Sequence, residues 1–179
     1  MTEIPHFIAG KRFAGSGEQL ADVFDPSTGE VRRSVRLASE NDVALAVEAA
    51  QAAAPAWSAL NPQRRARVLF EFKRLVERDM DELANLLSSE HGKVVADSKG
   101  DIQRGLDVVE FACGAPHLLK GEFTENAGPG IDVFSMRQPL GVCAGITPFN
   151  FPAMIPCWMF AVSVACGNSF ILKPSEKDP

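Results

Sequence analysis

The sequence has no closely spaced cysteines, and this absence excludes the common cysteine-based zinc sites. The four cysteines are Cys113, Cys143, Cys157 and Cys166, and no two of them form a CxxC pair. We therefore expect no metal site. All four are predicted to be buried free thiols in a reducing compartment, where cysteine packs as a small apolar residue.

The chain also lacks an excess of positive charge. Its 18 lysines and arginines are outnumbered by 23 acidic residues, which gives a net charge of -5. No cluster of basic residues alternates with aromatic residues, as proteins that bind single-stranded nucleic acid require. We therefore expect no nucleic-acid partner.

Phosphate-binding and targeting motifs are missing as well. Neither GxGxxG nor GxxxxGK[ST] occurs, so a phosphate-binding loop cannot be inferred from a motif. The start, "MTEIPHFIAGKRF", lacks the basic and apolar segments of a secretory signal, which favours a cytoplasmic location. The apolar run 142–166 has the length of a membrane span, but three prolines interrupt it. We expect a buried strand, a turn and a helix there, and no membrane partner.

What the sequence does contain is the pattern of an α/β protein with a helical first half. Its 46% hydrophobic and 23% charged residues are typical of a globular domain. Turn residues near the start predict one or two β-hairpins. Apolar residues at helical spacing then predict helices over 39–57, 61–79, 79–92 and about 102–112. Ser39 with Asp42, and Asp79 with Glu82, have the spacing of capping boxes.

The second half changes to a strand-helix-strand pattern. Residues 131–146 predict two strands, separated by a break at Gln138 and Pro139. The segment "PAMIPCWMFAVSVACGN" predicts a helix that Gly167 ends, and "SFILKP" predicts a buried strand of a parallel sheet. The last residues, "SEKDP", are typical of a helix start, so we expect the chain to stop in mid-fold.

The segment "TPFNFP" places a polar residue, Asn150, in apolar surroundings. A residue before proline avoids the helical region, so the helix is predicted to begin at Pro152. Asn150 then has two interpretations. It is either a helix cap or a rigid carboxamide donor for an oxyanion at the helix N-terminus.

The segment "ILKPSEK" places Lys173 at the carboxyl end of the last strand, where ligands bind in open α/β sheets. Lysine donates to ribose hydroxyls and glutamate accepts from them, so Lys173 and Glu176 suit a nucleotide sugar. The alternative is a pair of ordinary charged residues in a surface loop.

Together, "GVCAGITPFNFPAMIPCWMFAVSVACGNSFILKPSEKDP", "DIQRGLDVVEFACGAPHLLKGE" and "FDPSTGEV" strongly resemble the aldehyde dehydrogenase superfamily, and within it the CoA-acylating methylmalonate-semialdehyde dehydrogenases. The resemblance covers nearly the whole chain. It implies an α/β fold, with 1–179 as an incomplete N-terminal part of a Rossmann-like NAD-binding domain that has a helical N-terminal region. It implies candidate oligomerisation strands at 131–146, a homo-oligomeric full-length enzyme and an absent catalytic domain.

The resemblance also implies roles for individual residues. Asn150 corresponds to the oxyanion donor. The residues that correspond to NAD contacts are Thr147, Phe149, Lys173, Glu176 and Lys177. At Lys177 the branch often has arginine, which departs from the family pattern. Arg104 corresponds to a position that holds the substrate carboxylate, for which a guanidinium is suited; a solvated helix arginine is the alternative.

The implied reaction converts a semialdehyde, NAD and CoA to propionyl-CoA or acetyl-CoA, carbon dioxide and NADH. A cysteine thiolate attacks the aldehyde, hydride passes to NAD, the carboxylate is lost and CoA accepts the acyl group. None of the four cysteines here stands in the matching motif, so we expect this chain alone to be inactive. Two alternatives remain: a non-acylating branch of the family, or a silent fragment that binds nucleotide or associates with other subunits.

Overall fold

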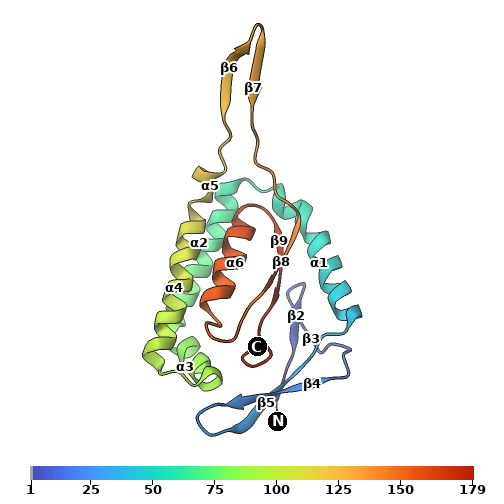
Figure 1. Cartoon of the computed structure of the whole chain (residues 1–179), viewed down its shortest axis with the longest axis vertical. Helices are drawn as coiled ribbons and strands as arrows, with labels where there is room; N and C mark the ends of the chain where they lie inside the picture. Colours follow the sequence, from blue (N-terminus) through green and yellow to red (C-terminus); the bar gives the residue numbers. More distant parts are fainter. Residues whose placement is uncertain (1) are drawn as a thin grey trace.

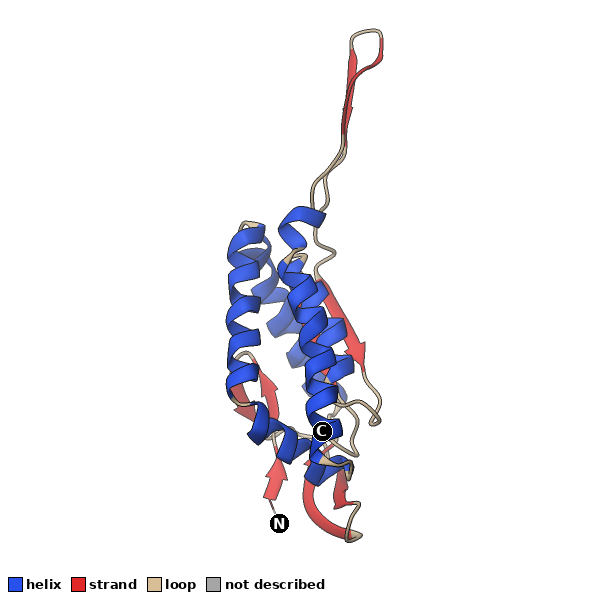
Figure 2. Ribbon diagram, turned by 90° about the vertical axis from the view of Figure 1, so that its left-hand side faces the viewer, coloured by secondary structure: helices blue, strands red, loops and turns tan. Residues whose placement is uncertain are grey.

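Residues 2–179 of the computed structural model form six helices and nine strands (Figures 1 and 2). The helices are α1 (Glu40–Ser58), α2 (Pro62–Arg78), α3 (Met80–His91), α4 (Val95–Cys113), α5 (Ala115–Leu118) and α6 (Met154–Ala165). The strands are β1 (Thr2–Ile4), β2 (His6–Ile8), β3 (Lys11–Phe13), β4 (Leu20–Asp25), β5 (Glu30–Arg36), β6 (Phe123–Gly128), β7 (Ile131–Phe134), β8 (Val142–Ile146) and β9 (Ser169–Lys173).

Two antiparallel hairpins, β2 with β3 and β4 with β5, open the chain, as the turn residues predict. The β2–β3 turn has Ala9 at φ 51 and Gly10 at φ 76, the left-handed pair that a two-residue hairpin favours. A third strand, β1, runs parallel to β5, so the sheet order is β1-β5-β4. Because β1 is only three residues long, its pairing leaves no periodicity in the sequence.

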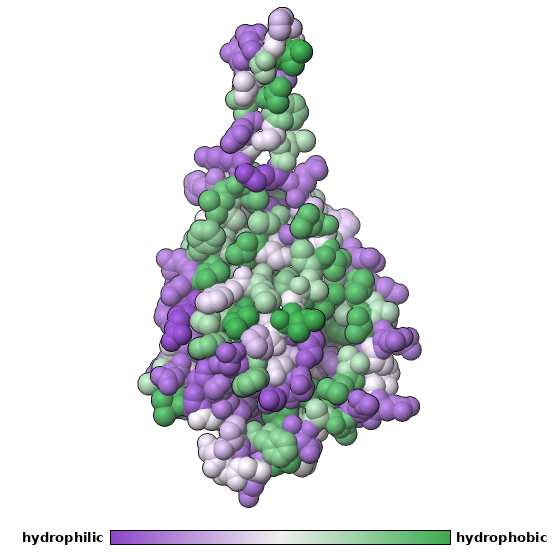
Figure 3. All heavy atoms as spheres, in the orientation of Figure 1, coloured by the Kyte–Doolittle hydropathy of each residue, from purple (hydrophilic) through white to green (hydrophobic). Residues whose placement is uncertain are grey.

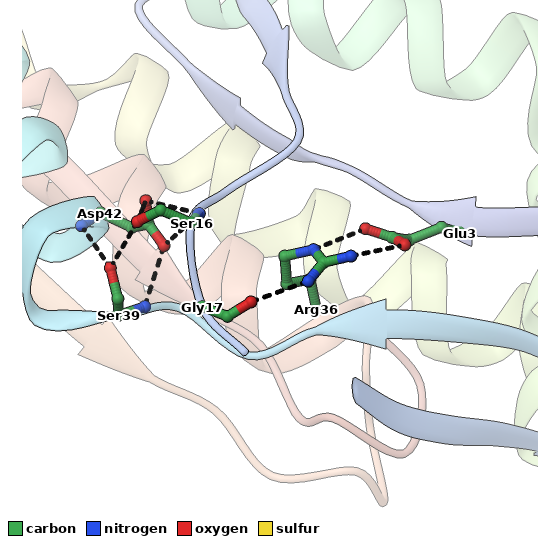
Figure 4. Close-up of polar contacts among 6 residues, drawn as sticks. All are labelled: Glu3, Ser16, Gly17, Arg36, Ser39 and Asp42. Atoms are coloured by element: carbon green, nitrogen blue, oxygen red, sulfur yellow. Dashed lines mark hydrogen bonds and ion pairs between the residues drawn. The ribbon is translucent and has the colours of Figure 1, made fainter. Parts of the chain in front are cut away.

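The N-terminus of α1 is tied to the chain before it. Ser39 and Asp42 form the predicted capping box. The buried Asp42 carboxylate also accepts the backbone N–H of Ser16 at 2.9 and 3.0 Å and the hydroxyl of Ser16 at 2.9 Å (Figure 4). Nearby, the Arg36 guanidinium donates to both carboxylate oxygens of Glu3 at 2.9 and 3.1 Å. These bonds fix the first sheet against α1.

The helix ends of α2 and α3 follow the predicted signals, with one exception. The Asn61 side chain accepts from the backbone N–H of Arg64 at the start of α2, and Gly92 ends α3 at φ 83. The predicted capping box at Asp79 is wrong, because its side chain makes no cap hydrogen bond. Its carboxylate instead accepts two bonds from the guanidinium of Arg78, which competes for the same oxygens.

Helix α4 packs against α2, α3 and α6. One buried cluster joins α2, α4, α5 and α6: Leu69, Val109, Ala112, Cys113, Ala115, Ala161 and Ala165. A second joins α3 and α4: Ala84, Leu87, Ile102 and Leu106. Gly105 lets α4 and α6 approach closely, since an added Cβ would lie 3.1 Å from the Cβ of Cys157 and 3.3 Å from the Cα of Met154.

A buried arginine holds the carboxyl ends of two helices together. Arg65 is 5% exposed, and its Nε donates to the carbonyl oxygen of Ala165 at 3.1 Å. The same guanidinium donates to the carbonyls of Ser58 and Leu60. Trp57 Nε1 donates at 2.9 Å to a carbonyl in the last turn of α6. Helix-terminal carbonyls have no partner within their helix, so these donors satisfy groups that would otherwise be buried unpaired.

The predicted strand-helix-strand unit is confirmed as β8-α6-β9. The two strands are parallel and in register from Val142 opposite Ser169 to Ile146 opposite Lys173. The predicted helix start at Pro152 is wrong, because α6 begins at Met154. Residues 152 and 153 form a turn that orients the first helical N–H toward α4.

The strands predicted within 131–146 occupy two different places. Strand β7 pairs with β6 in a hairpin that projects far from the helical body, whereas β8 lies against that body beside β9 (Figures 1 and 2). Strand β6 was not predicted. All but one of its residues are exposed, so it has no alternation of buried and exposed side chains.

No single helix in residues 2–179 has both the length and the apolar character of a membrane span. Helices α1 and α2 have this length and apolar character only when taken together, and the chain bends by 119° where they join.

We expect Arg65→Met to lower the free energy of unfolding by about 3 kcal/mol, because several buried carbonyls would lose a charged donor. The matched control is Arg67→Met, which removes an exposed arginine of the same helix. Urea unfolding followed by circular dichroism measures both. Equal stability of the two variants would contradict the role given to Arg65.

We also expect acid sensitivity from Asp42. Backbone hydrogen bonds from Ser16 and Ser39 hold the pKa of this carboxyl well below its usual range. Its stabilisation is therefore complete above the unfolded pKa of about 4 and is lost as the pH falls toward the folded pKa. Urea titrations should show Asp42→Asn less stable than the parent at pH 7, with a gap that narrows below pH ~4. A constant gap down to the lowest accessible pH would contradict this.

Candidate functional site

The candidate site lies at the carboxyl ends of the two parallel strands. Thr147 follows β8 directly, is 5% exposed, and donates its backbone N–H to the carbonyl of Lys173 at 3.1 Å. This bond extends the ladder by one residue and holds the two strand ends together. Ligands bind at this edge in open α/β sheets, so the structure places both residues where the sequence predicts a site.

The loop after β8 carries Asn150, which is exposed. Its backbone carbonyl accepts from Lys93 Nζ at 3.2 Å. The helix-cap interpretation of Asn150 is wrong, because the cap residue of α6 is Ala153 and no side chain caps that helix. Within residues 2–179, no hydrogen bond involves the Asn150 carboxamide. The side chain is therefore available to a ligand.

Two predicted contact residues lie together beside this loop. Phe149 is 48% exposed, and the Nζ atom of Lys177 lies 4.3 Å from the centroid of its ring. A cation over an aromatic face at this distance is attracted by the ring quadrupole. Phe149 thus offers one flat apolar wall with a positive charge next to it.

Lys173 and Glu176 pair with each other in the loop after β9. Lys173 Nζ donates to the Glu176 carboxylate at 3.0 Å, and both side chains are exposed. A hydrogen bond from its own backbone amide and the nearby Lys173 lower the pKa of Glu176. Glu176 is therefore a carboxylate at neutral pH, and the pair presents one donor and one acceptor side by side at the strand edge.

Arg104 reaches the same region from α4. It is exposed, and its guanidinium carbon lies 5.8 Å from the centroid of the Phe151 ring. Trp158, which is 44% exposed, donates its Nε1–H to the carbonyl of Arg104 at 3.2 Å. The structure thus places Arg104 close to Phe151, the residue after Asn150. Because 46 residues separate the two in the sequence, the motif around Asn150 alone does not predict this contact.

Two residues near the site were missed by sequence reasoning, Lys93 and Asp101. Asp101 is completely buried, accepts Lys93 Nζ at 2.9 Å, and accepts the backbone N–H of Met154 at 2.7 Å. A signal for Asp101 was present. It lies on the buried face of α4 one residue before Ile102, and a carboxylate on such a face requires a partner.

Ionisable groups around this ion pair have shifted pKa values. Burial, and then the charge of Lys93, lower the pKa of His91. Burial, and then the charge of Glu90, raise the pKa of Asp178 to about 7. Glu90 itself is paired with Arg33, although burial raises its pKa. Among the residues that the structure describes, Lys93 is the only cation that hydrogen-bonds Asp101.

Two of the four cysteines have raised thiol pKa values. All four are free; Cys113 is buried, and Cys143, Cys157 and Cys166 are partly buried. Burial raises the pKa of Cys113, and burial together with the charge of Asp101 raises the pKa of Cys157 to about 11. A nucleophilic cysteine has a lowered pKa in a positively charged setting, so these two thiols have the opposite character. The structure groups no three potential metal ligands within residues 2–179.

Comparison with known proteins identifies one family. The family model described as "Aldehyde dehydrogenase family" matches residues 13–179. The chain is 51% identical to a malonate-semialdehyde dehydrogenase of Pseudomonas aeruginosa, over 100% of this chain and 36% of that protein. It is 49% identical to the mitochondrial, acylating methylmalonate-semialdehyde dehydrogenase of Arabidopsis thaliana, over 98% of this chain and 29% of that protein.

Among solved structures, a protein of Sinorhizobium meliloti 1021 described as a methylmalonate-semialdehyde dehydrogenase, complexed with NAD, superimposes with a TM-score of 0.98. It is 62% identical, and the match covers 100% of this chain and 36% of that one. The methylmalonate-semialdehyde dehydrogenase of Oceanimonas doudoroffii superimposes with a TM-score of 0.97 at 52% identity, with the same coverage. The chain thus spans about a third of the length of the relatives it matches.

The shifted pKa of Cys157 leads to a prediction about its reactivity. With a pKa of about 11, only about one thiol in a thousand is a thiolate at pH 8. We therefore expect iodoacetamide at pH 8 to leave Cys157 unmodified in the folded chain and to label it rapidly in urea, as measured by peptide mass spectrometry. Rapid labelling in the folded state would contradict the view that this thiol is inert.

Proposed function

The chain belongs to the aldehyde dehydrogenase family, and we propose that it is the N-terminal, nucleotide-binding part of an NAD-dependent, CoA-acylating dehydrogenase of methylmalonate or malonate semialdehyde. The observation that carries this proposal is the arrangement at the strand edge. Asn150, whose carboxamide is exposed, lies in the loop after β8, and the paired Lys173 and Glu176 lie at and just after the end of β9, the parallel neighbour of β8.

The residues at this edge fit NAD. Lys173 and Glu176 satisfy each other across 3.0 Å, and exposed ion pairs of this kind add little to stability. They can therefore exchange their mutual bond for bonds to the two hydroxyls of a ribose. Thr147 and Phe149 line the approach, and Lys177 places a positive charge beside the Phe149 ring. When bound, NAD supplies the acceptor for the hydride that leaves the substrate.

Asn150 is proposed as the donor to the oxyanion of the substrate. Attack of a thiolate on the aldehyde carbon turns the carbonyl oxygen into an oxyanion. The Asn150 carboxamide would donate an N–H to that oxygen, and a donor fixed in advance stabilises the transition state most effectively. The exposure of the side chain and its lack of partners within residues 2–179 suit this role.

Arg104 is proposed to bind the carboxylate that distinguishes a semialdehyde of a dicarboxylic acid from a simple aldehyde. A guanidinium presents a planar fork that matches a carboxylate. Arg104 lies over the ring of Phe151, the residue after Asn150. Arg104 would therefore bind the carboxylate end of a short substrate while Asn150 binds its aldehyde oxygen. The names of the Pseudomonas and Arabidopsis relatives support a substrate of this class.

We propose that the nucleophilic thiol and the catalytic domain lie outside these 179 residues, and that this chain alone is inactive. The raised pKa values of Cys113 and Cys157 support this. So does an apolar face over α6 and the β8–β9 pair, where hydrophobic residues gather in the middle of the surface (Figure 3). Ile146 of β8 is 75% exposed and Trp158 of α6 is 44% exposed. Further chain would cover this face.

The projecting hairpin supports a second role, in association between subunits. Strands β6 and β7 form an isolated two-stranded sheet, and both of its edges lack neighbours within residues 2–179. Phe123, Ile131, Val133 and Phe134 are each more than half exposed. Of the region 131–146 we therefore propose β7, with β6, as the association element. We propose that β8 belongs to the nucleotide-binding sheet.

The proposed function can be tested with a chimera in which residues 1–179 replace the matching segment of the Sinorhizobium meliloti relative. We expect the purified chimera to form NADH only when the semialdehyde, NAD and CoA are all present. The isolated 179-residue chain should form none. NADH formation by the isolated chain would contradict the missing nucleophile.

The same assay separates the acylating reaction from its alternative. NADH formation at full rate without CoA, with a free acid as product, would replace the acylating proposal by the non-acylating branch of the family. A chimera that is folded and binds NAD but oxidises no semialdehyde would leave only a nucleotide-binding role. Size analysis of the isolated chain tests association through β6 and β7.

We expect Asn150→Ala in the chimera to lower the turnover rate by about 100-fold, which is typical for loss of one oxyanion donor. Its thermal midpoint should stay at that of the parent, because the side chain has no structural partner in the part of the chain described. Stopped-flow NADH absorbance and thermal melts measure the two effects. A variant with normal turnover and a lowered midpoint would show a structural role instead.

A further inference from the structure

We propose that Lys93 and Asp101 are positioning residues that hold the loop carrying Asn150 at its middle and at its carboxyl end. This inference rests on the proposed function of Asn150 as an oxyanion donor. It assigns a role to two residues that the sequence motifs do not include, and neither of them needs to touch the substrate.

The two residues bind the backbone at Asn150 and at Met154. Lys93 Nζ donates to the backbone carbonyl of Asn150 at 3.2 Å. Asp101 accepts the backbone N–H of Met154, the first residue of α6, at 2.7 Å. Lys93 and Asp101 are joined to each other at 2.9 Å. One ion pair thus binds the carbonyl of Asn150 in the loop and the amide of Met154 at the start of α6, four residues further on.

Burial makes this grip strong. The Asp101 side chain is fully buried and that of Lys93 is 11% exposed. Hydrogen bonds that involve a charged partner are about twice as strong as neutral ones. Little water competes at the buried bond between Asp101 and the Met154 amide, whereas the bond from Lys93 to the Asn150 carbonyl is exposed. The charge also matters to Met154. An amide that begins a helix has no partner within the helix, and the Asp101 carboxylate supplies one.

The surrounding side chains restrict the loop further. Lys93 Nζ lies 4.8 Å from the centroid of the Phe151 ring, and the Arg104 guanidinium lies 5.8 Å from it. Two cations therefore contact the ring of the residue next to Asn150. Pro148 and Pro152 fix φ on both sides of it. The two prolines therefore restrict the backbone on both sides of Asn150, and the bond from Lys93 restricts the orientation of the Asn150 carbonyl.

Asp101 belongs to α4, and Lys93 lies in the short connection between α3 and α4. Lys93 follows Gly92, whose left-handed conformation at φ 83 ends α3 and turns the chain toward the loop. Asp101 lies on the buried face of α4, one turn before Gly105, where α4 and α6 come closest. The position of Asn150 is thus set through α4, which packs against both α3 and α6.

The test uses Lys93→Met in the chimera described above, because methionine keeps most of the side-chain length and removes both donated bonds. We expect the turnover rate to fall about 10- to 100-fold, since a donor displaced by about 1 Å costs a factor of this order. The KM for NAD should change less than threefold. Lys93→Arg, which retains a donor, should recover part of the rate. Lys99→Met is the matched control, because Lys99 pairs with Asp81 at the exposed side of α4.

A double-variant cycle distinguishes positioning from general support of the fold. If Lys93 acts through Asn150, Lys93→Met should lower turnover by less than threefold in an Asn150→Ala background. If the two losses multiply, or if Lys93→Met alone leaves turnover unchanged, the proposal is wrong. Asp101→Asn should behave like Lys93→Met. If that variant fails to fold, the Lys93 variants alone decide.

Hydrogen exchange keeps the proposal testable even if the parent chimera has no dehydrogenase activity, an outcome that would refute the proposed function alone. Mass spectrometry of a peptide spanning residues 148–155 reports directly on the Met154 amide. We expect at least tenfold faster exchange there in Lys93→Met than in Lys99→Met, with unchanged exchange in the rest of α6. Equal exchange in the two variants would overturn the proposal whatever the activity.

Discussion

The candidate site depends on one buried carboxylate, Asp101. It joins α4 to the first turn of α6 through the amide of Met154, and it joins both to the end of α3 through Lys93. A charge can stay in such a place only if it is paired and hydrogen-bonded. Gly105, one turn further along α4, lets the two helices come close enough for these bonds. This contact ties the loop that carries Asn150 to the helical layer.

The candidate site therefore contains two kinds of charged residue. Asp101 and Lys93 are buried and committed to each other and to backbone groups, so they hold the loop in place. Lys173 and Glu176 are exposed and form an ion pair with each other, so their bond is weak and can be exchanged for a ligand. This division is what a binding site needs, because its supporting groups must be rigid and its contact groups must be free.

Residues that are local in sequence were predictable, and contacts between distant residues were not. The capping box at Ser39, the cap at Asn61 and the β8-α6-β9 unit follow from short-range spacing, and the structure confirms them. Asp79 was misjudged because the adjacent arginine binds its carboxylate. The start of α6 was misjudged because a residue 53 positions away binds its first amide. Strand β6 carried no signal, since its side chains pack against almost nothing.

The central claim, that Asn150 is a donor held in place for a substrate oxyanion, is tested most directly by a crystal structure of the chimera with NAD and a thiohemiacetal formed from a semialdehyde analogue. The decisive measurement is the distance between Asn150 Nδ2 and the oxygen of the adduct. We predict about 2.7–3.1 Å, as for other oxyanion donors, with the contact from Lys93 to the Asn150 carbonyl retained. An Asn150 side chain turned away from the adduct, and bonded to the protein instead, would contradict the account.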